Sequence, residues 1–190
     1  MQPQSQPLLW EKVSVCVPQT LTGPTINNGT NTPNNALGAG GLMTASTFTE
    51  NTINANHNVR YTGVVVPINS KVRASVWIAR GTGTNNRYVR MWVTDSGATY
   101  GFYTELDLQA GTAAIAVALG SGRVSGGTDS ISITPVASGF NVTVTGIFSI
   151  TLSGSPVVWM SSETAPNAFF YTGSGTQSFA YESVGLCVFS

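Results

Sequence analysis

The sequence predicts an all-β protein, a single domain built as an antiparallel β-sandwich. Apolar residues alternate with polar ones along most of the chain, which is the period of half-buried strands rather than of helices. Thr, Ser, Asn and Gly supply most of the polar side chains, and turn-forming residues are spread over the whole length, as in a sandwich of many strands. With 190 residues the chain can bury one sizeable core without disulfide or metal staples, so one domain is expected.

The chain is expected to begin with a short extended arm, residues 1–7, ahead of a sandwich formed by residues 8–190. Prolines bracket the arm, and nothing in it can pack a core. An arm of this kind can clasp a neighbouring protein, and its candidate contact residues are Gln2, Pro3, Gln4, Gln6 and Pro7. The first strand is expected from Leu8 to Val17, where Pro18 stops it.

A long connection rich in Thr, Asn, Gly and Pro follows the first strand, over residues 19–41. It is long for a structureless loop in a compact domain, so we expect either a functional loop or a short irregular strand within it. Residues 42–47 are the candidate for that strand. The next extended run is expected from His57 to Val66, and Pro67 marks a turn after it.

Three consecutive segments between Val72 and Leu108 predict the centre of the fold. Each alternates between an apolar set and a polar or aromatic set, and short turns separate them, so we expect a three-stranded meander. The apolar set is expected to face one core: Val72, Ala74, Val76, Ile78, Val89, Met91, Val93, Phe102 and Leu106. The alternate set should then gather on the opposite face: Arg73, Trp77, Tyr88, Arg90, Trp92, Tyr103 and Glu105.

This alternate set is the main candidate for a functional surface, and three interpretations of it stay open. Flat aromatic rings flanked by polar groups suit sugar recognition, because an apolar sugar face stacks on a ring while the hydroxyls bond to the rim. The same residue types are enriched where protein subunits meet. The third interpretation is ordinary packing of the tryptophans under loops or a second sheet. In each case Arg73, Arg90 and Glu105 can form an ion network across the strands.

The rest of the chain predicts further strands separated by turns. A turn at residues 108–112 precedes expected strands at residues 114–119, 130–136, 140–152, 157–160 and 179–189, with loops at 123–129 and 161–175. The strand at 140–152 is long and is expected to be central, with Gly146 marking a bend or bulge. No stretch has the apolar spacing of a helix of three turns.

The two cysteines, Cys16 and Cys187, lie near opposite ends of the chain and are too few for a disulfide framework or a zinc site. One interpretation is a pair of buried free thiols. The other is that the first and last strands are neighbours, which would bring the two thiols close enough to pair.

Charge and hydropathy exclude several classes of function. Eight basic and eight acidic residues give no basic field that could hold nucleic acid. No window has the run of about 18 apolar residues that a membrane helix needs, and the start has no secretion signal, so we expect a soluble protein made in the cytosol. A surface this poor in charge favours a protein that is partly covered by partners in an assembly.

Catalytic and cofactor motifs are absent from the sequence. The one histidine, His57, lies in an Asn-rich segment without a nucleophile motif. Glu105 and Asp107 can share a strand face, but the eight acids are otherwise scattered, and a solvated strand end is a simpler interpretation than the acid pair of a glycosidase. Phosphate loops, His/Cys metal spacings and acidic calcium loops are missing, so we expect no enzyme, no cofactor and no metal site.

Several motifs follow one another in a recognisable order: Leu8-Leu9-Trp10, the Thr/Asn-rich segment to Thr52, and residues 72–79, 100–112, 138–146 and 171–176. In this order they resemble the lectin-like, carbohydrate-binding-module-type β-sandwich domains of bacteriophage structural proteins. The resemblance spans nearly the whole chain. It implies a jelly-roll sandwich that holds particle proteins together or contacts host-surface glycans, and it does not imply catalysis.

We therefore expect a non-enzymatic structural protein of a bacteriophage virion, assembled in the host cytoplasm, with a capsid decoration or short head spike as the first expectation. A tail-fibre tip usually needs a shaft or anchor, whereas residues 1–190 contain only the sandwich and the arm. The expected partners are capsid or other virion proteins, and a homotrimer or homodimer is expected. The alternative is a glycan-binding module of a tail fibre or tail spike, with this stacking set: Trp77, Tyr88, Trp92 and Tyr103.

Overall fold

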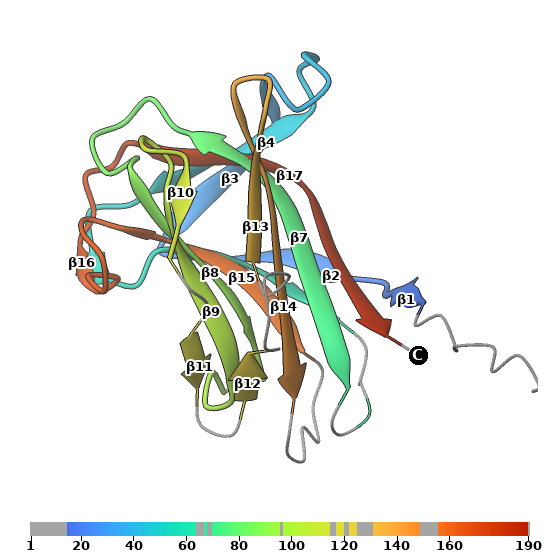
Figure 1. Cartoon of the computed structure of the whole chain (residues 1–190). Coiled ribbons are helices and arrows are strands. Elements are labelled where there is room, and N and C mark those ends of the chain that lie inside the picture. Colours follow the sequence, from blue (N-terminus) through green and yellow to red (C-terminus); the bar gives the residue numbers. More distant parts are fainter. Residues whose placement is uncertain are drawn as a thin grey trace, which may run out of the picture.

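The computed structural model describes residues 15–63, 67, 70–95, 97–114, 117–119, 122–124, 131–148 and 156–189. The predicted arm and most of the predicted first strand lie outside these residues. Two antiparallel sheets pack face to face, and the described part of the chain contains no helix (Figure 1). The all-β sandwich predicted from the sequence is therefore confirmed.

The first sheet has eight strands, and its main path places β7 and β17 at the centre. In spatial order this path is β12 (Gly122–Val124), β14 (Gly139–Phe148), β7 (Lys71–Arg80), β17 (Gln177–Phe189), β4 (Ala45–Glu50) and β3 (Gly29–Ala36). Two further strands extend it, because β13 (Ile131–Val136) pairs with β14 and β1 (Cys16–Pro18) pairs with β17.

The second sheet has seven strands and lies behind the first in Figure 1. Its order is β10 (Thr112–Ala113), β9 (Gly101–Asp107), β8 (Tyr88–Thr94), β15 (Val157–Glu163), β6 (Asn58–Thr62) and β2 (Thr22–Asn27), and β11 (Val117–Leu119) also pairs with β9. A small separate ribbon joins β5 (Asn54–Ala55) to β16 (Tyr171–Thr172).

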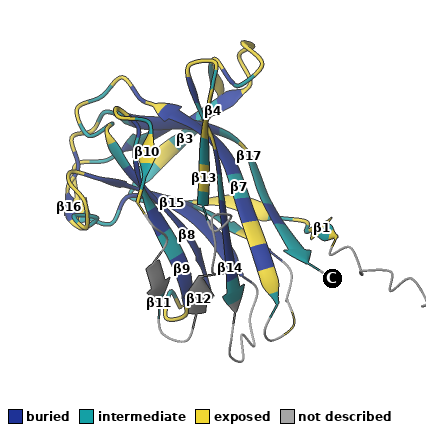
Figure 2. Ribbon diagram, in the orientation of Figure 1, coloured by how far each residue is buried: buried dark blue, intermediate teal, exposed yellow. Residues whose placement is uncertain are grey.

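The core lies between the two sheets and contains all nine apolar residues that the alternation assigns to it. β7 shows the pattern most clearly, since its exposed and buried residues alternate along the first half of the strand (Figure 2). The three segments are strands at nearly the predicted positions. The prediction that their apolar sets face one core is confirmed.

The prediction of a three-stranded meander is wrong. β7 pairs with β14 and β17 in the first sheet, whereas β8 pairs with β9 and β15 in the second. Residues 81–87 carry the chain across, and backbone bonds from Gly81 to Ser178 O at 3.0 Å and from Gly83 to Gln177 O at 2.8 Å hold the crossing along β17. Alternation tells which side of a strand is buried but not which strand lies beside it, because both sheets face the same core.

Residues 19–41 contain two irregular strands, β2 and β3, so of the two alternatives the strand is correct and the loop is wrong. These strands are the outer edges of the two sheets, joined at a corner where Asn28 has φ of 53°. Their side chains are mostly exposed and uncharged, which hides the alternation that a half-buried strand would show. The strand predicted at 42–47 is β4, which begins at Ala45 after a loop at residues 37–44.

Prolines lie in four of the strands at the sheet edges. Pro18 is the last residue of β1, Pro24 lies in β2, Pro33 in β3 and Pro135 in β13. Proline has no backbone N–H to offer to a further strand, so it is tolerated at an edge and hinders pairing there. The edge strands β10 and β11 are protected differently, because they are only two and three residues long.

The later strands agree with the sequence in place and differ in their ends. β13 matches residues 130–136, β11 covers the end of 114–119, and β14 covers 140–152 as far as Phe148, beyond which the predicted strand lies outside the described residues. β15 continues to Glu163 and β16 lies within the segment predicted as one loop, 161–175. The predicted strand at 179–189 is β17, which begins at Gln177.

The first and last described strands are neighbours, as one interpretation of the cysteines required. β1 pairs antiparallel with the end of β17, and Cys16 and Cys187 form a disulfide with their Cα atoms 5.4 Å apart. The alternative of two free thiols is therefore wrong. This bond links the first described strand to the last one covalently.

Gly146 does not mark a bulge. The ladder between β14 and β7 runs without a shift through Thr145↔Arg73 and Gly146↔Val72. The glycine is needed for a different reason, because the ring of Phe102 from the opposite sheet occupies the place of its missing Cβ. Glycine in a strand often marks such a close approach.

Gly146→Ala is therefore expected to lower the free energy of unfolding by about 1–3 kcal/mol, since the added carbon would overlap the Phe102 ring and force the two sheets to shift. Urea unfolding followed by tryptophan fluorescence measures the change. Gly40→Ala is the matched control, because nothing lies within 4 Å of a Cβ built at that exposed glycine. Equal stability of the two variants would contradict the packing argument.

Candidate functional site

The structure divides the predicted surface set between the two outer faces of the sandwich. Five of its residues share the outer face of the second sheet: Tyr88, Arg90, Trp92, Tyr103 and Glu105. Arg73 and Trp77 lie on β7 and therefore on the outer face of the first sheet. The prediction that all seven residues gather on one face is therefore wrong, and so is an ion network that includes Arg73. The reason is that β7 and β8 belong to different sheets.

Trp77 packs under loops, as the third interpretation of the set proposed. It is 1% exposed and sits against three alanines: Ala45, Ala79 and Ala180. Ala36, Ala39 and Val136 cover it further, and its indole Nε1 donates to Val136 O at 3.1 Å. The ring offers no face to a ligand.

A row of four side chains crosses the outer face of the second sheet. Its members are cross-strand partners on β9, β8, β15 and β6: Tyr103, Trp92, Trp159 and Arg60, which we call the aromatic row. The rings of Trp92 and Trp159 are stacked at 4.5 Å with 10° between their planes, and the Arg60 guanidinium lies 4.6 Å from the centre of Trp159. Partners on one face of an antiparallel pair stabilise each other in this way.

Trp159 and Arg60 are members of the row that the sequence interpretation missed. Both lie in predicted strands, but the continuous run Val157–Met160 has no alternation that could show which side faces outward. Trp92 and Trp159 are only 5% and 4% exposed, because they cover each other and neighbouring side chains cover their edges. Their indole N–H groups donate to Ser161 Oγ and Thr94 Oγ1, both at 3.1 Å. The tryptophans are therefore not open platforms for stacking.

Arg90 is the charged centre beside this row and is 2% exposed. Its guanidinium contacts the carboxylate of Glu105, lies 2.8 Å from Glu163 Oε1, and donates to Asn167 Oδ1 at 2.9 Å. Three aromatic rings enclose it, with centres 4.3 Å away for Tyr103, 4.8 Å for Trp92 and 4.9 Å for Phe169. The predicted pair of Arg90 and Glu105 is present, and the loop after β15 closes over it.

Glu163 is the least solvated acid of this cluster, because its side chain is completely buried. Burial raises the pKa of its carboxyl to about 8, with Arg90 lowering it and the charge of Glu105 raising it further. Among the described residues neither of its oxygens accepts a hydrogen bond, although one forms the ion pair with Arg90. The folded protein therefore favours the uncharged form of the Glu163 carboxyl more than water does.

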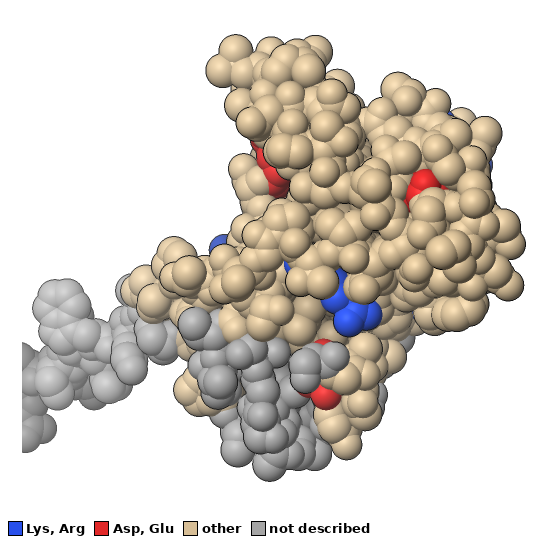
Figure 3. All heavy atoms as spheres, turned by 180° about the vertical axis from the view of Figure 1, so that it is seen from behind, with Lys and Arg blue, Asp and Glu red and all other residues tan. Residues whose placement is uncertain are grey.

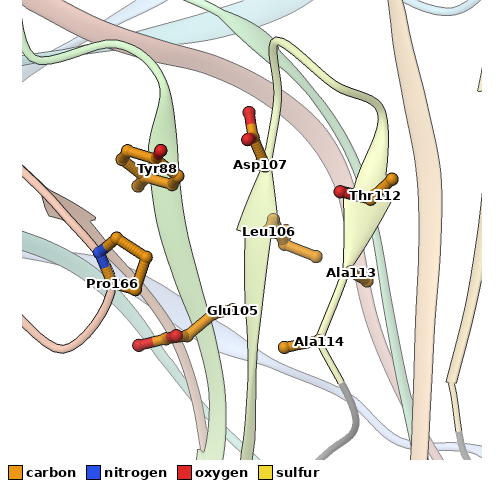
Figure 4. Close-up of a pocket in the computed structure, with 8 residues that line it drawn as sticks. All are labelled: Tyr88, Glu105, Leu106, Asp107, Thr112, Ala113, Ala114 and Pro166. Carbon is orange, nitrogen blue, oxygen red and sulfur yellow. The ribbon is translucent and has the colours of Figure 1, made fainter.

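A pocket of about 310 Å³ opens next to the cluster, between β8, β9 and β10 (Figure 4). Tyr88 and Pro166 form one side and the segment at Thr112–Ala114 forms the other, with Glu105 and Asp107 between them. The Arg87 guanidinium lies 2.8 Å from Asp107, and its hydrogen bonds hold the pKa of that carboxyl below its usual value. The pocket therefore combines an aromatic ring and apolar carbons with charged carboxylates and a hydroxyl.

A second buried carboxylate, which the sequence interpretation also missed, lies near Glu163, because the hydroxyl of Ser162 on the same strand donates to it. Glu50 is 2% exposed and accepts hydrogen bonds from Tyr171 Oη at 2.5 Å, from the Ser174 backbone N–H at 2.7 Å and from Asn85 Nδ2 at 2.8 Å. The hydroxyls of Ser174 and Ser178 donate to it as well, at 2.5 Å and 3.1 Å. Burial alone would raise the pKa of Glu50, but the hydrogen bonds from Ser174, Tyr171 and Asn85 together hold it below its usual value.

The groups that the sequence considered for catalysis are engaged in structural contacts. His57 is fully buried, with Nδ1 2.7 Å from Asn28 O and Nε2 3.2 Å from Tyr171 O. Glu105 and Asp107 share a face as predicted, and each is bonded to an arginine. The described residues include no group of three or more His, Cys, Asp or Glu placed to hold a metal ion.

Comparison with known proteins assigns no family to this chain. No protein-family model matches the sequence, and no curated protein matches it. Over the residues that the structure describes, no helix has the length and apolar character to cross a membrane.

The free energy of unfolding is expected to depend less on pH in Glu163→Gln than in the wild type. Folding raises the pKa of Glu163 to about 8, so between about pH 4.5 and pH 8 the folded state keeps a proton that the unfolded state releases. The free energy of unfolding of the wild type should fall over this range, and that of Glu163→Gln should fall less. Urea unfolding at about pH 5, 6.5 and 8 measures both slopes. A slope for Glu163→Gln as steep as that of the wild type would contradict the assignment.

Proposed function

We propose that this chain is a non-enzymatic structural protein of a bacteriophage particle, where it decorates the capsid or forms a short head spike. The observation that carries the proposal is an exposed apolar loop on a surface with little charge. The resemblance of the sequence to phage β-sandwich domains supports a bacteriophage particle as the assembly that the chain joins. The structural roles of His57, Glu105 and Asp107 agree with a protein whose task is to bind rather than to catalyse.

The 37–44 loop projects from the upper end of the sandwich in Figure 1, between β3 and β4. It contains no charged residue, and it exposes 53% of Leu37, 68% of Leu42 and 54% of Met43. Seen from behind, the projection and most of the face below it are uncharged, with isolated basic and acidic groups (Figure 3). Large apolar side chains gathered on a protrusion are typical of a contact with another protein.

The loop is held in one conformation by Glu182 of β17. One carboxylate oxygen accepts the Ala39 N–H at 2.6 Å and the other accepts the Thr44 hydroxyl at 2.7 Å. Gly38 leaves the space that this carboxylate fills, since a Cβ there would overlap it. A loop fixed before binding loses less conformational entropy when a partner covers it, which favours its use as a docking element.

The proposal is tested on particles of the phage that encodes the chain, by immunogold electron microscopy with antibody against the purified protein. We expect label over the head for the wild type and for Ile53→Ser, which removes an apolar residue that is 55% exposed elsewhere. Leu42→Ser combined with Met43→Ser should remove the label, and deletion of residues 2–7 should weaken it if the arm also holds the shell. Absence of wild-type label from particles would contradict the proposal.

A second candidate function is recognition of host-surface glycans, and the pocket beside Tyr88 favours it. A sugar ring can pack its apolar face on Tyr88 and Pro166 while its hydroxyls donate to Glu105 and Asp107. This differs from the stacking set expected from the sequence. Trp77 and Trp92 are buried, and Tyr88 is the member that lines a pocket.

For this function Tyr88→Ala is expected to reduce glycan binding at least tenfold, because it removes the aromatic wall of the pocket. A glycan array probed with labelled protein identifies ligands, and titration calorimetry measures their affinity. Tyr100→Ala is the matched control, since Tyr100 is exposed and lies outside the pocket. Unchanged binding by Tyr88→Ala would exclude this pocket as the glycan site.

A further inference from the structure

A second pocket lies on the outer face of the first sheet, away from the aromatic row. It has a volume of about 330 Å³ and is lined by residues of β1, β7, β14 and β17, among them the two cysteines of the disulfide: Cys16, Pro18, Arg73, Ser75, Thr143, Gly185, Leu186 and Cys187. Two rows of the sheet form its floor. Ser75 is the cross-strand partner of both Thr143 and Gly185, and Arg73 is the partner of Cys187.

Arg73 lines this pocket and Lys71 lies over the same phenyl ring beside it, and among the described residues neither has an acidic partner. The guanidinium of Arg73 and the ammonium of Lys71 lie 4.9 Å and 5.0 Å from the ring centre of Phe189, so one phenyl ring positions both. In the described part of the chain neither cation forms an ion pair with an acid. Arg87 and Arg90, by contrast, both do so. The described acid on the neighbouring row of β17, Glu182, already uses both oxygens to hold the 37–44 loop.

The pocket also offers hydroxyl groups that the fold does not use. Within the described residues no hydrogen bond engages the hydroxyl of Ser75 or that of Thr143. Gly185 keeps Ser75 accessible, because a Cβ at this position would lie 2.8 Å from Ser75 Oγ. Polar groups that a protein leaves unsatisfied beside a cation are the groups by which a pocket fixes the orientation of a ligand.

We propose that this pocket binds an organic carboxylate. Arg73 presents a planar fork whose two N–H groups match the two oxygens of a carboxylate, and the hydroxyls of Ser75 and Thr143 can donate to the same group. Pro18, Leu186 and the disulfide provide apolar contact for the carbon skeleton of the ligand. The volume is that of a small-molecule site, larger than one inorganic ion fills, which favours an acid with a body of several carbons.

The carboxylate site does not depend on the proposed function. It uses residues on the opposite outer face from the Tyr88 pocket and none of the 37–44 loop. The protein could fail to label a particle and still bind the acid, or label it and not bind. The two results are therefore distinguishable.

The binding test uses the full chain labelled with ¹⁵N and titrated with D-glucuronate, with D-glucose as the neutral counterpart that lacks the carboxylate. We expect glucuronate to shift the amide signals of Ser75, Thr143 and Gly185 and the Nε signal of Arg73, and glucose to leave them in place. The affinity should weaken as salt is added, because the contact pairs opposite charges. Shifts of equal size with glucose, or sulfate binding as tightly as glucuronate, would overturn the assignment to an organic carboxylate.

Arg73→Gln supplies the decisive variant and is expected to weaken glucuronate binding at least tenfold. Arg73 is exposed and makes no ion pair among the described residues, so the variant should fold, which its circular dichroism and its unchanged signals in the second sheet would verify. Arg80→Gln is the matched control, since Arg80 lies at the other end of β7, about 23 Å along the strand, and donates to Asn86 Oδ1. Equal affinities of Arg73→Gln and wild type would overturn the proposal.

Discussion

The buried carboxylate of Glu50 joins the segments at which the chain passes between its two sheets. Asn85 reaches it from the crossing between β7 and β8, Tyr171 and Ser174 from the segment that returns from β15, and Ser178 from the start of β17. Removing one charged acceptor would leave several buried donors without partners, each costing about 1–3 kcal/mol. The crossing decides that β8 enters the second sheet. The positions of Arg90, the aromatic row and the Tyr88 pocket therefore depend on the contacts of Glu50.

The two outer faces of the sandwich differ in whether their cations are buried and paired with acids. On the second sheet Arg90 is buried between two acids and three rings, so its charge is used within the fold. On the first sheet Arg73 and Lys71 are exposed beside the ring of Phe189, and neither has an ion-pair partner among the described residues. A buried and paired cation fixes a loop, whereas an exposed and unpaired one remains available to a ligand. The acids next to an arginine therefore decide whether its charge is used within the fold.

Periodicity predicts the strands and the core of this protein well. All nine inward residues of β7, β8 and β9 lie in the core, and most strands begin within a few residues of the predicted position. The pattern does not report which strands pair, so the crossing at residues 81–87 and the separation of Arg73 from Arg90 were not predictable from it. β2 and β3 were missed because exposed, uncharged strands at an edge have no apolar face. The roles of Glu50 and Glu163 depend on partners at least 35 residues away in the sequence, or on a covering loop, which no local pattern contains.

The prolines in β2, β3 and β13 bear on what happens when many copies are crowded together. An open sheet edge is a template on which another chain can add a strand, and repeated addition leads to domain exchange or fibrils. In the described strands the missing N–H groups of Pro24, Pro33 and Pro135 interrupt that template, and the edge strands β10, β11 and β12 are only two or three residues long. Addition of a strand from a second copy is therefore disfavoured at these edges. The sandwich is built to stay a separate folded unit at high concentration, where a chain with long regular edges would tend to exchange strands.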